Sequence, residues 1–182
     1  FKEGENSFKL AGVGSQTELD LSGKMFKSSA EIKDFSFVDV SGYAPISFTM
    51  SDLAYEEDYG KGVSITEYFA GAAVADGKGS VKSVKVDDIS LLEFAFTSQS
   101  AKSKNQSLPE AGEMLASKVN ISIKSVESPM MQIKLDDIKG EFEVENVSME
   151  FVQAFYAGEF GAILPDDMLQ IFFATQPVVK FS

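Results

Sequence analysis

The sequence predicts a mainly β (α+β) fold, a twisted or half-open antiparallel sheet with short helices toward the C-terminal end. Two observations support this class: a six-residue pattern typical of strands recurs along the chain, and helical patterns occupy few segments. The 182 residues are 44% hydrophobic, enough for a core without disulfides or metals. We expect residues 1–182 to form a single β-rich domain, a fragment of a longer protein because the sequence starts with Phe1.

The recurring pattern reads apolar, any, apolar, any, Asp or Asn, apolar. It occurs at residues 30–35, 48–53, 84–89, 133–138 and 142–147, and at 121–126 with Ser125 in the fifth place. Its first half alternates as a strand with one buried face does. Its last apolar residue comes three positions later, which in a regular strand would face the other side. We therefore predict a β-bulge at the acidic residue; the alternative is a strand covered on both faces. Asp88 and Asp137 are expected in bulges or turns at strand ends.

The connections follow from glycine, proline and polar stretches. We interpret residues 133–138 and 142–147 as two antiparallel strands joined at Lys139-Gly140. The strand before them is expected to end at Ser128-Pro129. The polar residues 98–107 are predicted to form a mobile loop, and 108–117 a short helix.

Two segments have helical character near the C-terminal end. Residues 148–157 place apolar side chains on one face before Gly158, and 164–174 begin with Pro165 followed by two aspartates. Both helices are expected to pack on the sheet. Residues 64–75 fit a strand and a helix about equally well.

Most catalytic chemistry is excluded by composition. The chain has no histidine and no cysteine, which removes Ser-His-Asp triads, thiol nucleophiles and the usual zinc ligands. We predict no catalytic residue, no metal, no cofactor and no enzymatic activity. Only a carboxylate-dependent glycan hydrolase stays open, from the acidic pairs Asp87-Asp88, Asp136-Asp137 and Asp166-Asp167. These pairs are better explained by turns and a helix start, since neighbours on a strand face opposite sides.

The charge narrows the range of partners. Acidic residues number 28 and basic residues 16, all of them lysine, so the net charge is -12. Such a surface repels phosphate backbones, and nucleic acid is not expected as a partner. The acidic stretches 56–58 and 76–79 lack the ligand spacing of calcium loops and are interpreted as solvated turns.

Sixteen phenylalanines are many for a chain without tryptophan. Five of them lie on predicted strands with alternate spacing: Phe35, Phe37, Phe48, Phe94 and Phe96. Core packing is the simpler explanation for any one of them. Together they suggest a weaker hypothesis, that a curved sheet uses them on its concave face to bind an acyl chain.

Residues 46–53, 77–86, 119–126 and 131–155 resemble the YdgA-like family of bacterial envelope proteins, a group of unknown function. The resemblance implies a periplasmic or cell-envelope location in a Gram-negative bacterium, with a membrane anchor outside this chain. It transfers no site residue. The leading hypothesis is a non-enzymatic envelope domain that binds a protein partner or an apolar, lipid-like ligand. A surface adhesin or structural module is the alternative, for which an exposed aromatic patch without a cavity would argue.

Overall fold

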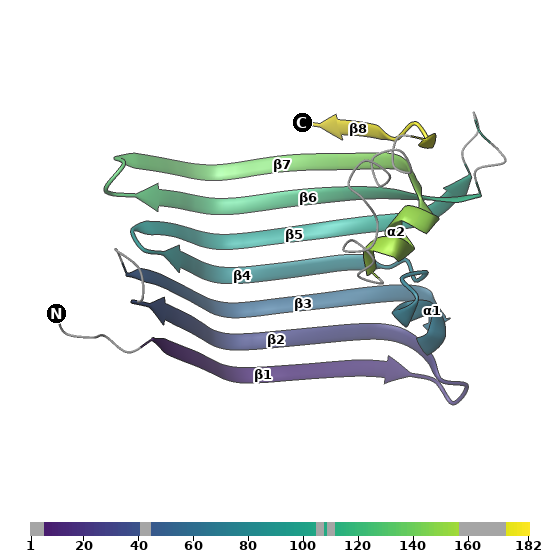
Figure 1. Cartoon of the computed structure of the whole chain (residues 1–182), viewed down its shortest axis with the longest axis horizontal. Helices are drawn as coiled ribbons and strands as arrows, with labels where there is room; N and C mark the ends of the chain where they lie inside the picture. The colour runs from purple at the N-terminus through teal and green to yellow at the C-terminus, as the bar shows by residue number, and fades with distance from the viewer. Residues whose placement is uncertain (1–5, 41–44, 105–107, 109–111, 157–173) are drawn as a thin grey trace.

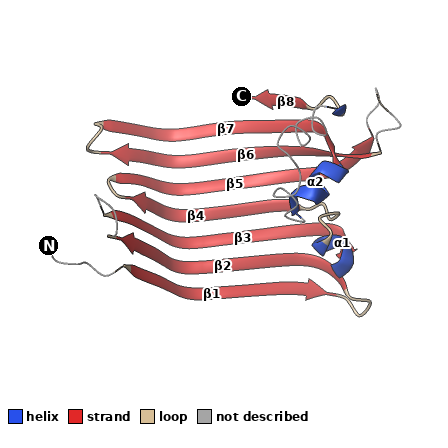
Figure 2. Cartoon of the chain, viewed as in Figure 1, coloured by secondary structure: helices blue, strands red, loops and turns tan. Residues whose placement is uncertain are grey.

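The computed structural model describes residues 6–40, 45–104, 108, 112–156 and 174–182. Eight strands form one antiparallel sheet in which each strand pairs with the next in sequence, as Figure 1 shows. The strands are β1 (Ser7–Leu19), β2 (Lys24–Asp39), β3 (Ile46–Ser64), β4 (Asp76–Val86), β5 (Ile89–Lys104), β6 (Glu113–Ser128), β7 (Ile133–Ser148) and β8 (Val178–Phe181). Two short helices, α1 (Ile65–Phe69) and α2 (Met149–Tyr156), complete the fold (Figure 2). The predicted class, a mainly β antiparallel open sheet with short helices, is confirmed.

Two tight turns lie where the sequence predicts interruptions. β4 and β5 are joined at Asp87 and Asp88, and Asp87 has φ 53°, which aspartate tolerates better than most residues. β6 and β7 are joined by a turn in which Gln132 N–H donates to the Pro129 carbonyl at 3.2 Å. The turn at Asp88 and the break after Ser128 are therefore confirmed.

Three expected interruptions are instead continuous strand. β7 runs unbroken from Ile133 to Ser148, so the hairpin at Lys139-Gly140 was wrong: Gly140 pairs with Ile121 in the middle of the ladder. The loop over 98–107 was wrong through Lys104, because residues 98–104 pair with 113–119. The same pairing replaces the expected helix from Glu113 to Ser117 by strand. Polar residues are tolerated in these strands because one face of the sheet meets water.

Two of the three other segments with helical character form helices in the structure, and the third lies almost wholly outside the described residues. α2 confirms the helix expected over 148–157, and α1 resolves the ambiguity of 64–75 in favour of a helical turn. Ser64 caps α1, because its hydroxyl accepts from Glu67 N–H while the Glu67 carboxylate accepts from Ser64 N–H. The helix expected at 164–174 and the glycine stop at 158 fall almost wholly outside the described residues.

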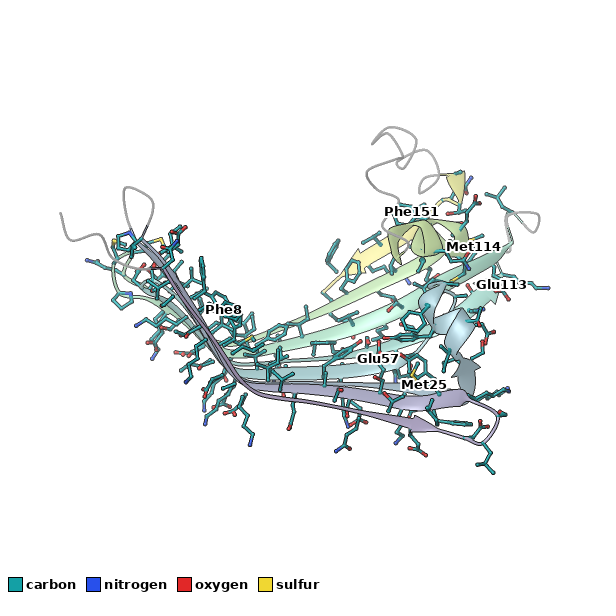
Figure 3. The ribbon with its side chains drawn as sticks, turned by 60° about the horizontal axis from the view of Figure 1, so that its bottom comes forward. Phe8, Met25, Glu57, Glu113, Met114 and Phe151 are labelled. Carbon is teal, nitrogen blue, oxygen red and sulfur yellow. The ribbon has the colours of Figure 1, made fainter. Side chains whose placement is uncertain are left out.

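All seven long strands bend along one row of residues, which divides the sheet into two arms. Figure 3 shows the arms meeting at an angle, with α1 and α2 on the inner side of the longer arm. The row contains Gly12, Lys33, Asp52, Lys82, Glu93, Lys124 and Asp137, one residue from each of β1 to β7. The strand register is the same on both sides of the row, as the pairs Ser51–Ser83 and Leu53–Val81 illustrate.

Alternate strands bend through a left-handed backbone conformation. The row residues of β1, β3, β5 and β7 have φ of 63° (Gly12), 49° (Asp52), 48° (Glu93) and 52° (Asp137). β2, β4 and β6 place a lysine in the row instead. Glycine and aspartate enter this conformation at low cost, whereas glutamate has no such preference.

The bend explains why the apolar spacing in the sequence changes from two to three. Met50 and Leu53 flank Asp52, and the other six strands repeat this three-residue spacing across the row. In a regular strand, apolar side chains three residues apart would face opposite sides of the sheet, and the bend at the row residue brings them to the same side. Each of β1 to β7 has the extra residue of this spacing in the same row. Neighbouring strands therefore keep the same number of residues, and the register continues across the bend. The prediction of a bulge at Asp137 is therefore wrong. The strand has an irregularity there, but it is a bend without a register shift.

A true bulge does occur elsewhere in the same strand. The register between β6 and β7 shifts between Leu115 and Ser117, opposite Asn146, which has φ 59°. Asn146 is the fifth residue of the 142–147 copy, so the predicted bulge is confirmed at this copy.

Paired charges stabilise the outer side of the bend. Lys82 Nζ lies 3.5 Å from Asp52 Oδ2, and Lys124 Nζ donates to the Glu93 carboxylate. Both pairs are more than half exposed, so each contributes no more than about 1 kcal/mol. From β2 to β7 the row alternates lysine and acidic residues, so each charge has an opposite charge on the neighbouring strand.

The turn at Asp88 makes the stability of the sheet end depend on pH. Asp88 Oδ2 accepts from Ser128 Oγ at 2.6 Å and from Met130 N–H at 3.3 Å, which joins the two turns. The hydrogen bond from Ser128 is the main cause that lowers the pKa of Asp88 below its ordinary value near 3.8. A lowered pKa means that this stabilisation is complete above about pH 4 and is lost as the pH falls through the folded-state pKa.

We therefore expect Asp88→Asn to flatten part of the acid dependence of stability. Urea midpoints measured from pH 6 to pH 2.5 should fall less steeply for the variant than for the parent chain. Asp136→Asn, on β7, is the control. Parallel curves for the parent and Asp88→Asn would contradict the linkage.

Candidate ligand-binding site

Most of the inner face of the sheet is uncovered. The chain exposes 12550 Å², whereas a compact protein of 19.8 kDa exposes about 8,600 Å². Few described hydrophobic side chains are buried. Val81 lies at the bend, and the others lie toward the helix-bearing end: Met25, Tyr59, Val63, Met114, Val147 and Met149. The rest of the inner face is an apolar surface open to solvent, larger than solitary exposed residues would make.

The five phenylalanines predicted as ligand-binding lie on both arms of the bent sheet. Phe35 contacts Phe8 and Phe48 edge-to-face, with ring centroids 5.3 and 5.5 Å apart. Figure 3 places Phe8 inside the angle, so these contacts put Phe35 and Phe48 there as well. Phe37 follows Phe35 by two residues and shares its face.

On the longer arm, Phe94 and Phe96 lie 6.1 Å apart, and Phe96 meets Tyr55 at 6.0 Å. Two aromatic groups therefore flank the bend, one on each arm. The structure does not gather all five residues into one pocket. They lie on the inner side of the bent sheet, which we call the trough, where Phe37 is exposed and the other four are half-buried.

The best-enclosed hollow lies on the inner side of the longer arm, between the sheet and the two helices. Its volume is about 450 Å³, within the range of small-molecule sites. The strands contribute Tyr55, Glu57, Tyr59, Gly77, Ser98, Ser100 and Leu115 to its lining. Helix α1 and the segment after it contribute Tyr68, Phe69, Gly71, Ala73, Val74 and Ala75. Helix α2 contributes Met149 and Val152. We call this hollow the helix pocket.

Small residues make the floor of the helix pocket. A Cβ at Gly79, next to this floor, would collide with the ring of Phe96, and one at Gly77 would lie 2.7 Å from Ser98 Oγ. Ser98 Oγ accepts from Gly77 N–H at 3.1 Å, which fixes the two strands closely. The absence of side chains at these glycines leaves the space that the Phe96 ring and Ser98 Oγ occupy.

One carboxylate lies among the aromatic rings of the pocket. Glu57 is half-buried, and its Oε1 accepts from Tyr55 OH at 2.8 Å while its Oε2 accepts from Tyr59 OH. Burial, and then the hydrogen bond to Glu57, raise the pKa of Tyr59 well above its ordinary value. Tyr59 is therefore a protonated donor, and the hydroxyls of Tyr55 and Tyr59 both point at Glu57.

The sequence reasoning missed this carboxylate. Residues 56–58 were expected in a solvated turn, but they lie inside β3, so that prediction was wrong. The spacing Tyr55-x-Glu57-x-Tyr59 places the three side chains on one face of a strand, a signal that was present in the sequence. The helices that enclose them, by contrast, could not be placed from the spacing.

A larger hollow of about 540 Å³ crosses the strands of the longer arm and includes Ala54, Ser80 and Ala95. Its charged residues Glu56 and Lys78 form an ion pair at 3.1 Å, and its walls are mostly the polar residues of the outer face. It is a shallow furrow over small side chains, so we place the candidate site in the helix pocket.

No cluster of acidic residues among the described positions could bind a metal. Asp87 and Asp88 are in a turn, Asp136 and Asp137 lie at the bend, and the pair at 166–167 is outside the described residues. Neither described helix is long and apolar enough to cross a membrane. Comparison with family models, with curated proteins and with solved structures finds no match to this chain.

Proposed function

We propose that this chain is a non-enzymatic binding domain that accommodates the apolar chain of a lipid-like ligand on the inner face of its bent sheet. The observation that carries the proposal is the continuity of this face. The bend at the row residue of each of β1 to β7 keeps the apolar side chains inside the angle on both arms, while much of that face stays uncovered. A sheet that only needed a core would bury these residues.

The helix pocket supports one end of the ligand. It is concave, mostly apolar and contains few polar groups, as small-molecule sites usually are. From it the apolar floor continues over Tyr55, Phe96 and Phe94 toward the bend. The proposed location in the bacterial envelope rests on the sequence resemblance alone.

The test is binding of a neutral apolar probe, N-phenyl-1-naphthylamine, followed by its fluorescence. Ser98→Phe should fill the helix pocket and weaken binding about tenfold or more, equivalent to at least ~1.4 kcal/mol. Thr97→Phe is the matched control, since the neighbouring residue faces the other side of β5. Phe69→Ser is a second variant, because Phe69 lines the pocket and is 77% exposed, so the fold does not depend on it.

The expected result is saturable binding that Ser98→Phe and Phe69→Ser weaken and Thr97→Phe leaves unchanged. Absence of saturable binding to the parent chain would refute the proposal. Equal losses in the variants of the two faces would also refute it, since binding would then be unrelated to the pocket. In either case, a protein partner on the inner face becomes the better hypothesis.

A further inference from the structure

The polar groups that line the helix pocket are mostly acceptors with their own donors already engaged. The protons of Tyr55 and Tyr59 go to Glu57. The hydroxyl of Ser98 donates to the Gly77 carbonyl at 3.4 Å, and Ser100 Oγ pairs with Ser117 Oγ at 2.9 Å. The Glu57 carboxylate has accepted two hydrogen bonds and has lone pairs for more. A ligand therefore meets a charged acceptor rather than a set of donors.

The charges around the pocket also favour a positively charged ligand over a negatively charged one. None of the described residues that line it is a lysine, and Glu57 is its one charged side chain. The whole chain has a net charge of -12. A ligand carboxylate or phosphate would therefore enter against repulsion, without a cation to meet it.

Four aromatic side chains line the pocket together with Glu57. Tyr59 and Tyr68 meet edge-to-face at 6.1 Å, and Tyr68 and Phe69 do so at 5.3 Å. Tyr55 approaches from the same strand as Tyr59 and shares its carboxylate partner. Ring faces near a carboxylate are the surroundings that ammonium groups prefer.

We propose that the helix pocket selects ligands with an ammonium group at the end of an apolar chain, through the Glu57 carboxylate and the rings of Tyr55, Tyr59, Tyr68 and Phe69. The inference rests on the proposed function and specifies its ligand class. The ammonium group lies beside Glu57, and the apolar chain runs over Leu115, Met149 and the open floor of the trough. Fatty acids, the common form of a free acyl chain, are then poor ligands.

The experiment compares three ligands of equal chain length, each used below its micelle concentration. Dodecyltrimethylammonium, dodecanol and dodecanoate are titrated against the full chain preloaded with N-phenyl-1-naphthylamine, and displacement is measured. We expect the ammonium ligand to displace the probe at about tenfold lower concentration than dodecanoate, with dodecanol between them.

Two variants test the assignment to Glu57. Glu57→Gln should reduce the ammonium preference by about tenfold while binding of the neutral probe is retained. Glu56→Gln is the matched control: it removes the same charge one residue away on the other face of β3 and should leave the preference unchanged. Phe69→Leu keeps an apolar side chain but removes one ring, and should weaken the ammonium ligand by a few-fold more than it weakens dodecanol. Because Phe69 is 77% exposed, this variant stays informative even if Glu57→Gln does not fold.

The outcomes separate the two proposals. If the neutral probe does not bind, the proposed function fails. If the probe binds but dodecanoate displaces it as well as the ammonium ligand does, only the present inference fails. Equal effects of Glu57→Gln and Glu56→Gln would also overturn it, because the preference would then reflect the overall negative charge.

Discussion

Replacing the three acidic residues of the bend by valine, in the triple variant Asp52→Val, Glu93→Val and Asp137→Val, is expected to destabilise the fold by about 3–6 kcal/mol. Each position has φ near +50°, where a β-branched side chain is strongly disfavoured. A cost of about 1–2 kcal/mol at each site, added over three strands that do not neighbour one another, gives this range. Urea unfolding measures the change.

The matched control is the triple glycine variant at the same positions. It removes the same three carboxylates and their ion pairs, but glycine enters the left-handed region freely. Its stability should stay within about 1 kcal/mol of the parent chain, because the exposed ion pairs contribute little. Equal stabilities of the valine and glycine variants would show that the left-handed row does not determine the bend.

The second large effect is expected at the best-buried side chain. Met114 on β6 is 0% exposed, and it lies opposite Ser148, directly before α2. Met114→Ala removes most of this side chain and leaves a cavity, which should lower the free energy of unfolding by about 3 kcal/mol. Thermal or urea unfolding measures the loss.

The control for this substitution is Met130→Ala. Met130 lies in the turn between β6 and β7, is 77% exposed, and contributes only its backbone N–H to Asp88. We expect a change within about 0.5 kcal/mol, as for other surface positions. Similar losses for the two methionines would mean that burial near α2 does not contribute specifically to stability.

The buried core and the proposed binding site lie in the same part of the molecule. The cluster of Met25, Tyr59 and Val63 lies beside α1, and Tyr59 also donates to the pocket carboxylate Glu57. The longer arm therefore combines the small core with the proposed site. The shorter arm contributes exposed aromatic surface and depends on the bend for its orientation.

Local sequence patterns were enough to predict strands with one apolar face. The alternation at residues such as 48–50 and 133–135 required a sheet with one apolar side, and the missing histidine and cysteine excluded most catalytic chemistry. The sequence also located the irregular positions, because the three-residue spacing around Asp52 and Asp137 does not fit a regular strand. Period and composition are local properties, and local sequence is enough to read them.

The conformation of the irregular positions depends on contacts between strands. Whether an extra residue makes a bulge or a bend depends on the strands beside it. At Asp137 the neighbouring strand has its own extra residue and the register continues, while at Asn146 the register shifts. Likewise, the sequence does not distinguish Glu57 from its acidic neighbours Glu56 and Asp58. The fold does, because β3 and the two helices, which are distant in sequence, enclose Glu57 in a pocket.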